Sequence, residues 1–145
     1  MRQLASGLAA WILGISLFWP SGSFAQEPAV DESDAIHAVV QMQLEAFAMD
    51  DAETAFEMAS DETQALLGSP QALLGVVREW YPALYRPHKA EFSSAEVVGG
   101  NAVQEVAITD SNGTVWIAIF LMTLDDHASW KIDSYHLLET TSVEI

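Results

Sequence analysis

Residues 78–89, REWYPALYRPHK, separate two parts of the chain that differ in the spacing of their apolar residues. Pro82 has no amide hydrogen, and its ring would clash with the carbonyl group of Arg78, so we expect a helix to end or kink there. Pro87 then holds Arg86 in an extended conformation. Helical spacing precedes the segment and β-rich runs follow it, so the segment predicts a junction between a helical layer and a sheet.

Three helices are predicted before this junction. The first covers roughly residues 34–49, where apolar side chains recur at helical spacing. Asp50 is a candidate cap for the second helix, because a glutamate follows three residues later, and residues 60–67 predict a further short turn. Ser69 and Pro70 begin the third helix, since proline is tolerated at the first helical position.

Four β-strands are predicted after the junction. The turns between them are so short that neighbouring strands must be antiparallel. The predicted strands are residues 89–98, 102–110, 114–125 and 130–138. Helices followed by an antiparallel meander indicate an α+β fold with the three helices packed on one face of the sheet.

The strand at residues 115–124, VWIAIFLMTL, is apolar on both of its faces. A strand of this kind needs cover on both sides. Because helices are expected on one face only, the other face would be an exposed apolar surface, which is typical of an interaction site. This pattern predicts a homodimer that forms through the sheet face.

Residues 1–25 have the form of a secretory signal peptide. Arg2 precedes an apolar span over residues 4–19, and Ser23 and Ala25 supply small residues before a cleavage site. The span is shorter than the roughly 20 residues that cross a bilayer, so we expect cleavage after Ala25 and no stable membrane anchor afterwards. The protein is therefore predicted to be periplasmic or secreted.

The rest of the chain is predicted to form one domain over residues 34–140, with a flexible mature N-terminus at 26–33 and a C-terminal tail at 141–145. There is no cysteine, so the core must hold the fold without disulfides. The formal net charge of −16 becomes −17 when cleavage removes Arg2, the one charged residue before the site. A field of this sign disfavours nucleic acid as a partner.

Several short motifs are similar to those of a family of small exported bacterial proteins, the domain of unknown function 4864 family. The most specific are Tyr81-Pro82 and Tyr85-Arg86-Pro87, and the others are Gln43–Phe47, Asp50-Asp51, Ala55-Phe56, Ala59-Ser60, Gly68–Pro70, Gln104 and Trp130–Ile132. The resemblance covers roughly residues 35–138. The chain departs from the family pattern at Ser134–His136, where a glycine-cysteine pair is common in the family.

The family resembles in layout the nuclear transport factor two-like and cystatin-like superfamily. This resemblance implies a curved sheet wrapped on helices into a cone. It implies no particular reaction, because the same layout serves isomerases, dehydratases, hydrolases and binding modules.

A site inside such a cone would lie between the third helix and the concave face of the sheet. Strand alternation starting from the apolar Trp130 and Ile132 places Ser134 and His136 on the inward face. His136 is a candidate general acid or base, and the alternative is a histidine held by a backbone or tyrosine partner. Gln104 is also predicted to point inward, where its amide could orient a ligand or tie neighbouring strands together.

Arg78 and Arg86 have two interpretations. Their guanidinium groups could stack on Tyr81 or Tyr85 and pair with acidic residues of the chain. Alternatively, both arginines could hold an anionic ligand at the mouth of the pocket, with the two tyrosines beside them.

No metal or cofactor site is predicted. The four histidines lack the paired spacing of a zinc site, and there is no phosphate loop or dinucleotide fingerprint. No carboxylate is placed convincingly in the pocket, because Glu105 and Asp133 are predicted on the opposite faces of their strands. This weakens the case for an enzyme.

The sequence therefore favours a non-catalytic domain that binds a small molecule or a protein partner. One alternative is a cofactor-free isomerase or hydrolase-like enzyme that uses His136 with Gln104 and a tyrosine. The other is a structural, dimeric interaction module. A cavity in which His136 and Gln104 converge would favour the enzyme, and a filled cone with an apolar outer sheet would favour the module.

Overall fold

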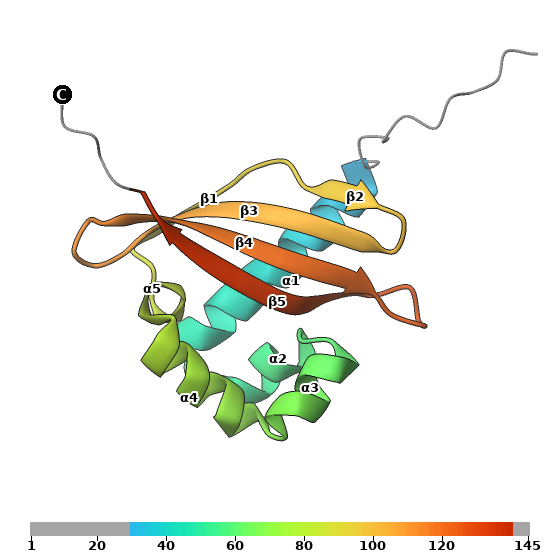
Figure 1. Ribbon diagram of the computed structural model, residues 1–145, viewed down its shortest axis with the longest axis horizontal. Coiled ribbons are helices and arrows are strands. Elements are labelled where there is room, and N and C mark those ends of the chain that lie inside the picture. The colour runs from blue at the N-terminus through green and yellow to red at the C-terminus, as the bar shows by residue number, and fades with distance from the viewer. Residues whose placement is uncertain (1–29, 141–145) are drawn as a thin grey trace, which may run out of the picture.

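The computed structural model describes residues 30–140, in which five helices precede five strands (Figure 1). The predicted α+β class is therefore confirmed. The predicted signal peptide at residues 1–25 and the predicted tail at 141–145 lie outside the described residues. None of the helices within the described residues is long and apolar enough to cross a membrane.

Helix α1, Val30–Ala48, begins four residues before the predicted start. Residues 30–33 are therefore helical, not part of a flexible N-terminus. Acidic side chains at Glu32 and Asp34 suit the positive end of the helix dipole. The inner side of α1 carries fully buried apolar residues at helical spacing, including Ile36, Val40 and Phe47.

Four shorter helices follow, and they are α2 (Ala52–Glu57), α3 (Asp61–Leu67), α4 (Pro70–Trp80) and α5 (Pro82–Tyr85). The prediction that Asp50 caps α2 is wrong. The cap is Asp51, whose carboxylate accepts a hydrogen bond from the amide of Thr54 at 3.2 Å. Asp50 lies one residue earlier with φ at 56°, so it turns the chain between the helices. Helix α4 ends before Pro82, as the proline predicts.

The sheet is antiparallel, with the order β1-β3-β4-β5. Its strands are β1 (Lys89–Phe92), β2 (Glu96–Val98), β3 (Asn101–Thr109), β4 (Val115–Leu124) and β5 (Trp130–Glu139). The single strand predicted over residues 89–98 is two strands, which pair with different parts of β3. Between them Ala95 is buried, and Gln104 Nε2 donates to the carbonyl oxygen of Ser93 at 2.7 Å.

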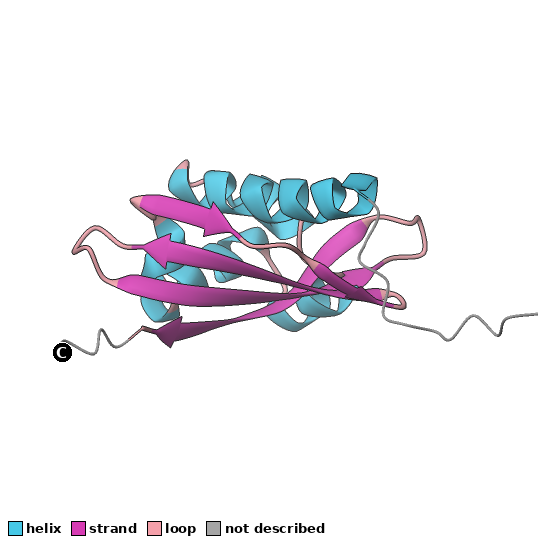
Figure 2. Cartoon of the chain, turned by 90° about the horizontal axis from the view of Figure 1, so that it is seen from above, coloured by secondary structure: helices cyan, strands magenta, loops and turns pink. Residues whose placement is uncertain are grey.

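Helix α1 crosses one face of the sheet, while no helix within residues 30–140 lies on the opposite face (Figures 1 and 2). The covered face supplies the core, and its fully buried side chains include Val106, Ile108, Ala118 and Phe120. The opposite face of β4 carries the half-exposed side chains of Ile117, Ile119 and Leu121. Both faces of β4 are therefore apolar, but only one is covered.

One irregularity in β5 determines which of its side chains point inward. Met122 of β4 pairs with Ile132, but Leu121 pairs with Ser134, so Asp133 is an extra residue in β5. This β-bulge reverses the alternation of side chains after it.

Tyr135 therefore pairs with the buried Phe120 on the inner face, and His136 pairs with Ile119 on the outer face. The prediction that His136 shares the inward face with Trp130 and Ile132 is wrong. The same reversal turns Leu138 outward.

Candidate ligand cavity

A cavity of about 170 Å³ lies between α3, α4 and the first half of β5. Its apolar wall is formed by Ala59, Leu66, Leu67, Leu73, Val76 and Ile132. Its polar groups come from Gln43, Thr63, Tyr81, Asp133, Ser134 and Tyr135. Apolar walls with a few polar groups are typical of small-molecule sites.

Gln43 of α1 has a buried hydrogen-bonding group at the wall that is without a partner. Its side chain is 1% exposed. Its Nε2 donates to the carbonyl oxygen of Ala55 at 3.1 Å, but its Oε1 has no hydrogen-bond partner. An unpaired buried acceptor costs roughly 1–3 kcal/mol. A donor that enters the cavity could recover this energy.

Two tyrosines form the aromatic part of the wall. Tyr135 packs edge-on against Tyr81, with ring centroids 4.9 Å apart, and tilted against Phe120 at 5.7 Å. Burial, with a smaller contribution from Tyr81, raises the pKa of Tyr135 well above its usual value. The Tyr135 hydroxyl is therefore neutral at physiological pH and can both donate and accept a hydrogen bond.

Asp133 at the bulge joins the rim of the cavity to α3. Its Oδ1 accepts a hydrogen bond from Ser60 Oγ at 3.0 Å, and its backbone oxygen accepts one from Thr63 Oγ1 at 2.7 Å. The sequence placed Asp133 on the face of its strand away from the pocket, whereas the residue borders the cavity at the bulge. Helix α3 itself has no buried side chain, so these hydrogen bonds help to hold it over the cavity.

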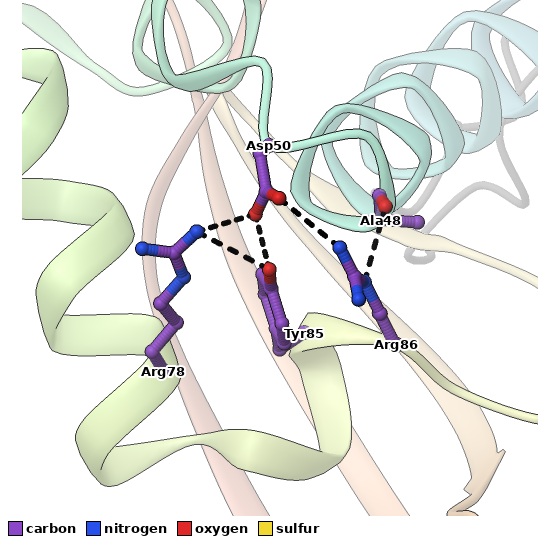
Figure 3. A network of polar contacts seen from close by, with 5 residues as sticks. All are labelled: Ala48, Asp50, Arg78, Tyr85 and Arg86. Carbon is purple, nitrogen blue, oxygen red and sulfur yellow. Dashed lines mark hydrogen bonds and ion pairs between the residues drawn. The ribbon is translucent and has the colours of Figure 1, made fainter.

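Arg78 and Arg86 lie elsewhere, where both pair with Asp50 (Figure 3). Arg78 Nη2 is 2.6 Å from Asp50 Oδ1, and Arg86 Nη2 is 3.1 Å from Asp50 Oδ2. Tyr85 donates its hydroxyl hydrogen to Asp50, while Arg86 Nε donates to the carbonyl oxygen of Ala48. The two guanidinium carbons lie 5.1 Å and 4.7 Å from the centre of the Tyr85 ring.

We call Asp50, Arg78, Tyr85 and Arg86 the Asp50 cluster. Hydrogen bonds from Tyr85 and Arg78 lower the pKa of Asp50 below its usual value, and hydrogen bonds with Tyr85 and Asp50 raise the pKa of Arg78. None of the four residues lines the cavity. The arginines thus have a carboxylate within the chain, and their charge is directed at the turn between α1 and α2.

The other predicted site residues are divided between the two faces of the sheet. Gln104 is 1% exposed and points inward as predicted, but both of its amide hydrogen bonds go to backbone oxygens, those of Ser93 and Glu105. His136 is on the outer face. It also borders a separate hollow of about 360 Å³ beside Trp80 and Trp116. Because Gln104 and His136 point to opposite faces, they do not form a common site.

Tyr81 and Ser134 line the cavity. Ser134 pairs with Leu121 of the outer face, however, so the prediction that it shares the inward face with Trp130 and Ile132 is wrong. Gln43, Tyr135 and Asp133 were missed. Gln43 could have been found, because it lies three residues after Val40 and four before Phe47, in the apolar stripe of the first helix. Among residues 30–140, no group of three or more histidine, aspartate or glutamate side chains is placed to hold a metal ion.

Solved structures with this arrangement define the class of fold. The chain is similar to an NTF2-like protein of unknown function from Shewanella baltica OS155, with 17% identity, a TM-score of 0.57 and coverage of 81% of this chain and 100% of that chain. It is also similar to an NTF2-like protein of unknown function from Methylobacillus flagellatus KT, with 16% identity, a TM-score of 0.58 and coverage of 79% and 97%. A third, from Silicibacter pomeroyi DSS-3, has 20% identity, a TM-score of 0.52 and coverage of 74% and 94%.

The fold is therefore NTF2-like. Within this class the chain belongs to the family described as domain of unknown function (DUF4864), whose model matches residues 29–145. A comparison with curated proteins gives no match. The fold and the family agree with the resemblance seen in the sequence, and neither specifies a ligand or a reaction.

Proposed function

We propose that this protein binds a small, neutral and mostly apolar ligand in the cavity between α3, α4 and β5. The observation that carries the proposal is the buried, unpaired Oε1 of Gln43 at the cavity wall. Buried polar groups in folded proteins nearly always have a hydrogen-bond partner. A hydroxyl or N–H group of a ligand would provide this partner.

The size of the cavity limits the ligand. A cavity of roughly 150 Å³ in an unrelated protein holds one benzene molecule. The cavity here, at about 170 Å³, therefore fits a ligand of about one aromatic ring with one or two substituents. Tyr81 and Tyr135 offer aromatic surfaces for such a ring.

The charge of the cavity favours neutral ligands over anions. No lysine or arginine is among the lining residues, and the carboxylate of Asp133 lies at the rim. An anionic ligand would lose its hydration and meet a charge of the same sign. This argues against the hypothesis of a carboxylate-bearing ligand held by Arg78 and Arg86, which are paired with Asp50.

The chemistry of the wall supports binding rather than acid-base catalysis. A catalytic acid or base works best with a pKa near the working pH. The pKa of the Tyr135 hydroxyl is raised far from that range, and His136 is on the other face of the sheet. The enzyme hypothesis that pairs His136 with Gln104 therefore loses its geometric basis.

Binding can be tested with three ring-sized probes, phenol, anisole and benzoate. We expect phenol, which has a hydroxyl donor, to raise the melting temperature most, anisole less, and benzoate least. Gln43→Met should weaken phenol binding about tenfold, because one buried hydrogen bond is lost. Gln41→Met is the matched control, since Gln41 is an exposed residue of the same helix and bonds only Glu45.

The outcomes test separately whether the cavity binds a ligand and whether Gln43 contributes to that binding. Failure of all three probes, together with native mass spectra that show no retained small molecule, would contradict ligand binding in the cavity. If phenol and anisole bind equally well, and Gln43→Met does not change this binding, the cavity remains the ligand site. The proposed role of Gln43 would then be overturned.

We further infer that the protein works outside the cytoplasm, after cleavage behind Ala25. The support is the charge, apolar span and small residues of the first 25 positions. The intact mass of protein recovered from the periplasm or the medium should correspond to a chain that starts at Gln26. A full-length mass in the membrane or cytoplasmic fraction would overturn this inference.

A further inference from the structure

The hollow beside Trp80 and Trp116, which we call the Trp80 hollow, lies between the end of α4, the start of α5 and the second half of β5. Its volume is about 360 Å³. The aromatic residues that line it are Trp80, Tyr81 and Trp116, and Leu137 of β5 lies beside them. Trp80 is the last residue of α4 and is 70% exposed, so the hollow presents an aromatic surface to solvent.

Both indole rings of the hollow are without an aromatic or cationic neighbour. Within residues 30–140, no aromatic ring stacks on Trp80 or Trp116, and no lysine or arginine lies over either of them. Trp116 is held by its edge, since its Nε1 donates to Asp110 Oδ2 at 3.0 Å. The face of an indole attracts cations more strongly than the face of any other aromatic side chain. The two indoles are therefore available to a positively charged group.

The charges around the hollow also favour a cation. No lysine or arginine is among its lining residues, because Arg78 and Arg86 pair with Asp50 instead. Glu139 is the cross-strand partner of Trp116, so its carboxylate lies on the same side of the sheet as the indole. Among the described residues, Glu139 takes part in no ion pair. A cation beside the indole would therefore meet a carboxylate.

We propose that the Trp80 hollow binds an organic cation with a quaternary ammonium head group. Such a group has no N–H donor and is recognised by aromatic faces. This matches the hollow, since no aspartate, glutamate, asparagine or glutamine is among its lining residues. A primary ammonium group or a metal ion would lose its water there without carboxylate or amide side chains to replace it. The formal charge of −16 adds a long-range attraction for cations.

The Trp80 hollow and the proposed ligand cavity select different ligands, although Tyr81 borders both. The cavity has a buried, unpaired acceptor and favours a neutral donor. The hollow has aromatic faces with a carboxylate beside them and favours a cation. Its volume is about twice that of the cavity, which leaves room for a trimethylammonium group with a short substituent.

The test compares choline with its neutral analogue, in which a tert-butyl group replaces the trimethylammonium group. We expect calorimetry to show saturable binding of choline, and the neutral analogue to bind at least about tenfold more weakly. In NMR spectra, choline should shift the indole N–H signals of Trp80 and Trp116. The signal of Trp130, which is buried at the other end of β5, should not move.

Two side chains can be changed without altering the core. Trp80→Leu should weaken choline binding about tenfold, whereas Trp80→Phe should retain part of it, because phenylalanine keeps an aromatic face. Glu139→Gln should weaken binding about threefold, as expected for one exposed charge. Glu96→Gln is the matched control and should leave binding unchanged, because Glu96 is an exposed residue of β2 that does not line the hollow.

Three results would overturn the proposal. The first is the absence of saturable choline binding up to about 10 mM. The second is equal binding of choline and its neutral analogue, which would show that the hollow selects apolar shape and not charge. The third is loss of choline binding in Gln43→Met, which would place the cation in the cavity. Gln43 lines the cavity and not the hollow, so this variant should bind choline as the wild type does.

Discussion

The Asp50 cluster and the wall of the cavity differ in whether their polar groups have hydrogen-bond partners. In the cluster, one carboxylate accepts hydrogen bonds from two guanidinium groups and a tyrosine hydroxyl, and both ion pairs are partly exposed to solvent. At the cavity wall, the amide oxygen of Gln43 is almost completely buried and accepts none. The charged groups of Asp50, Arg78 and Arg86 are therefore paired within the chain, while the amide oxygen of Gln43 has no donor.

This difference shows which kind of residue indicates a binding site in a small acidic domain. An exposed arginine among many carboxylates finds a partner within its own chain, and each such pair contributes little. A buried acceptor cannot form a hydrogen bond with water instead, so leaving it unpaired destabilises the folded protein. Burial without a partner is the stronger indication of a ligand.

The largest effect is expected from Gln43→Glu, which replaces the buried amide by an acid of the same shape. We expect the free energy of unfolding at pH 7 to fall by about 3 kcal/mol, because an ionised carboxylate would be buried without a partner. Burial raises the pKa of the new acid, so stability is retained below its unfolded pKa of about 4.3 and lost as the pH rises.

Urea denaturation at pH 4 and pH 7 measures this change. Gln41→Glu is the matched control and should change stability little at either pH, because Gln41 is exposed. If Gln43→Glu is as stable as the wild type at pH 7, the side chain is in contact with water, and the contrast with the Asp50 cluster disappears.

A smaller effect is expected from Asp50→Asn, which removes the charge that both arginines face. The melting temperature at pH 7 should fall. The pKa of Asp50 is lowered in the folded state by hydrogen bonds from Tyr85 and then Arg78. The contribution of the cluster is therefore present above the unfolded pKa of about 3.9 and lost as the pH falls through the folded value.

The difference in melting temperature between wild type and Asp50→Asn should thus shrink as the pH is lowered from 7 to 3. Asp126→Asn, in the turn between β4 and β5, provides the control, since it is not buried. A constant difference over this range would mean that the charge of Asp50 does not contribute to stability.

The smallest effect is expected from Arg86→Ala. It removes one of the two arginines on Asp50 and the hydrogen bond to Ala48, both at exposed positions. We expect a slightly lower melting temperature with no ligand present, and unchanged binding of phenol. If Arg86→Ala weakens phenol binding and leaves stability unchanged, Arg86 belongs to the ligand site instead. Lys89→Ala, which breaks an exposed ion pair with Glu91, is a suitable reference.

The fold class could be predicted because its signals are local. Pro82 and Pro87 end the helical part, and apolar spacing changes from helical to alternating after them. The cap of α2 was misplaced by one residue, since Asp50 and Asp51 are adjacent and either could cap a helix. The break between β1 and β2 was missed because Ser93 to Ala95 carry no glycine or proline.

The candidate site could be predicted only in part, because strand alternation assumes a regular strand. Tyr81 and Ser134 border the cavity, whereas the inward direction predicted for Ser134 and His136 is wrong. At the bulge, Asp133 accepts hydrogen bonds from Ser60 and Thr63, which lie 73 and 70 residues earlier in the chain. Such long-range contacts leave no local mark in the sequence.

The bulge at Asp133 also determines which side chain of β5 reaches the cavity. If Asp133 paired with Leu121 in place of Ser134, the bulge would be lost, and regular alternation would turn Tyr135 toward solvent and bring the imidazole of His136 to the inner face. A cavity that now offers a neutral phenol would then contain an imidazole, which is a common general acid or base in proteins. A shift in strand register could in this way exchange a phenol for an imidazole at the cavity, with no substitution at the site itself.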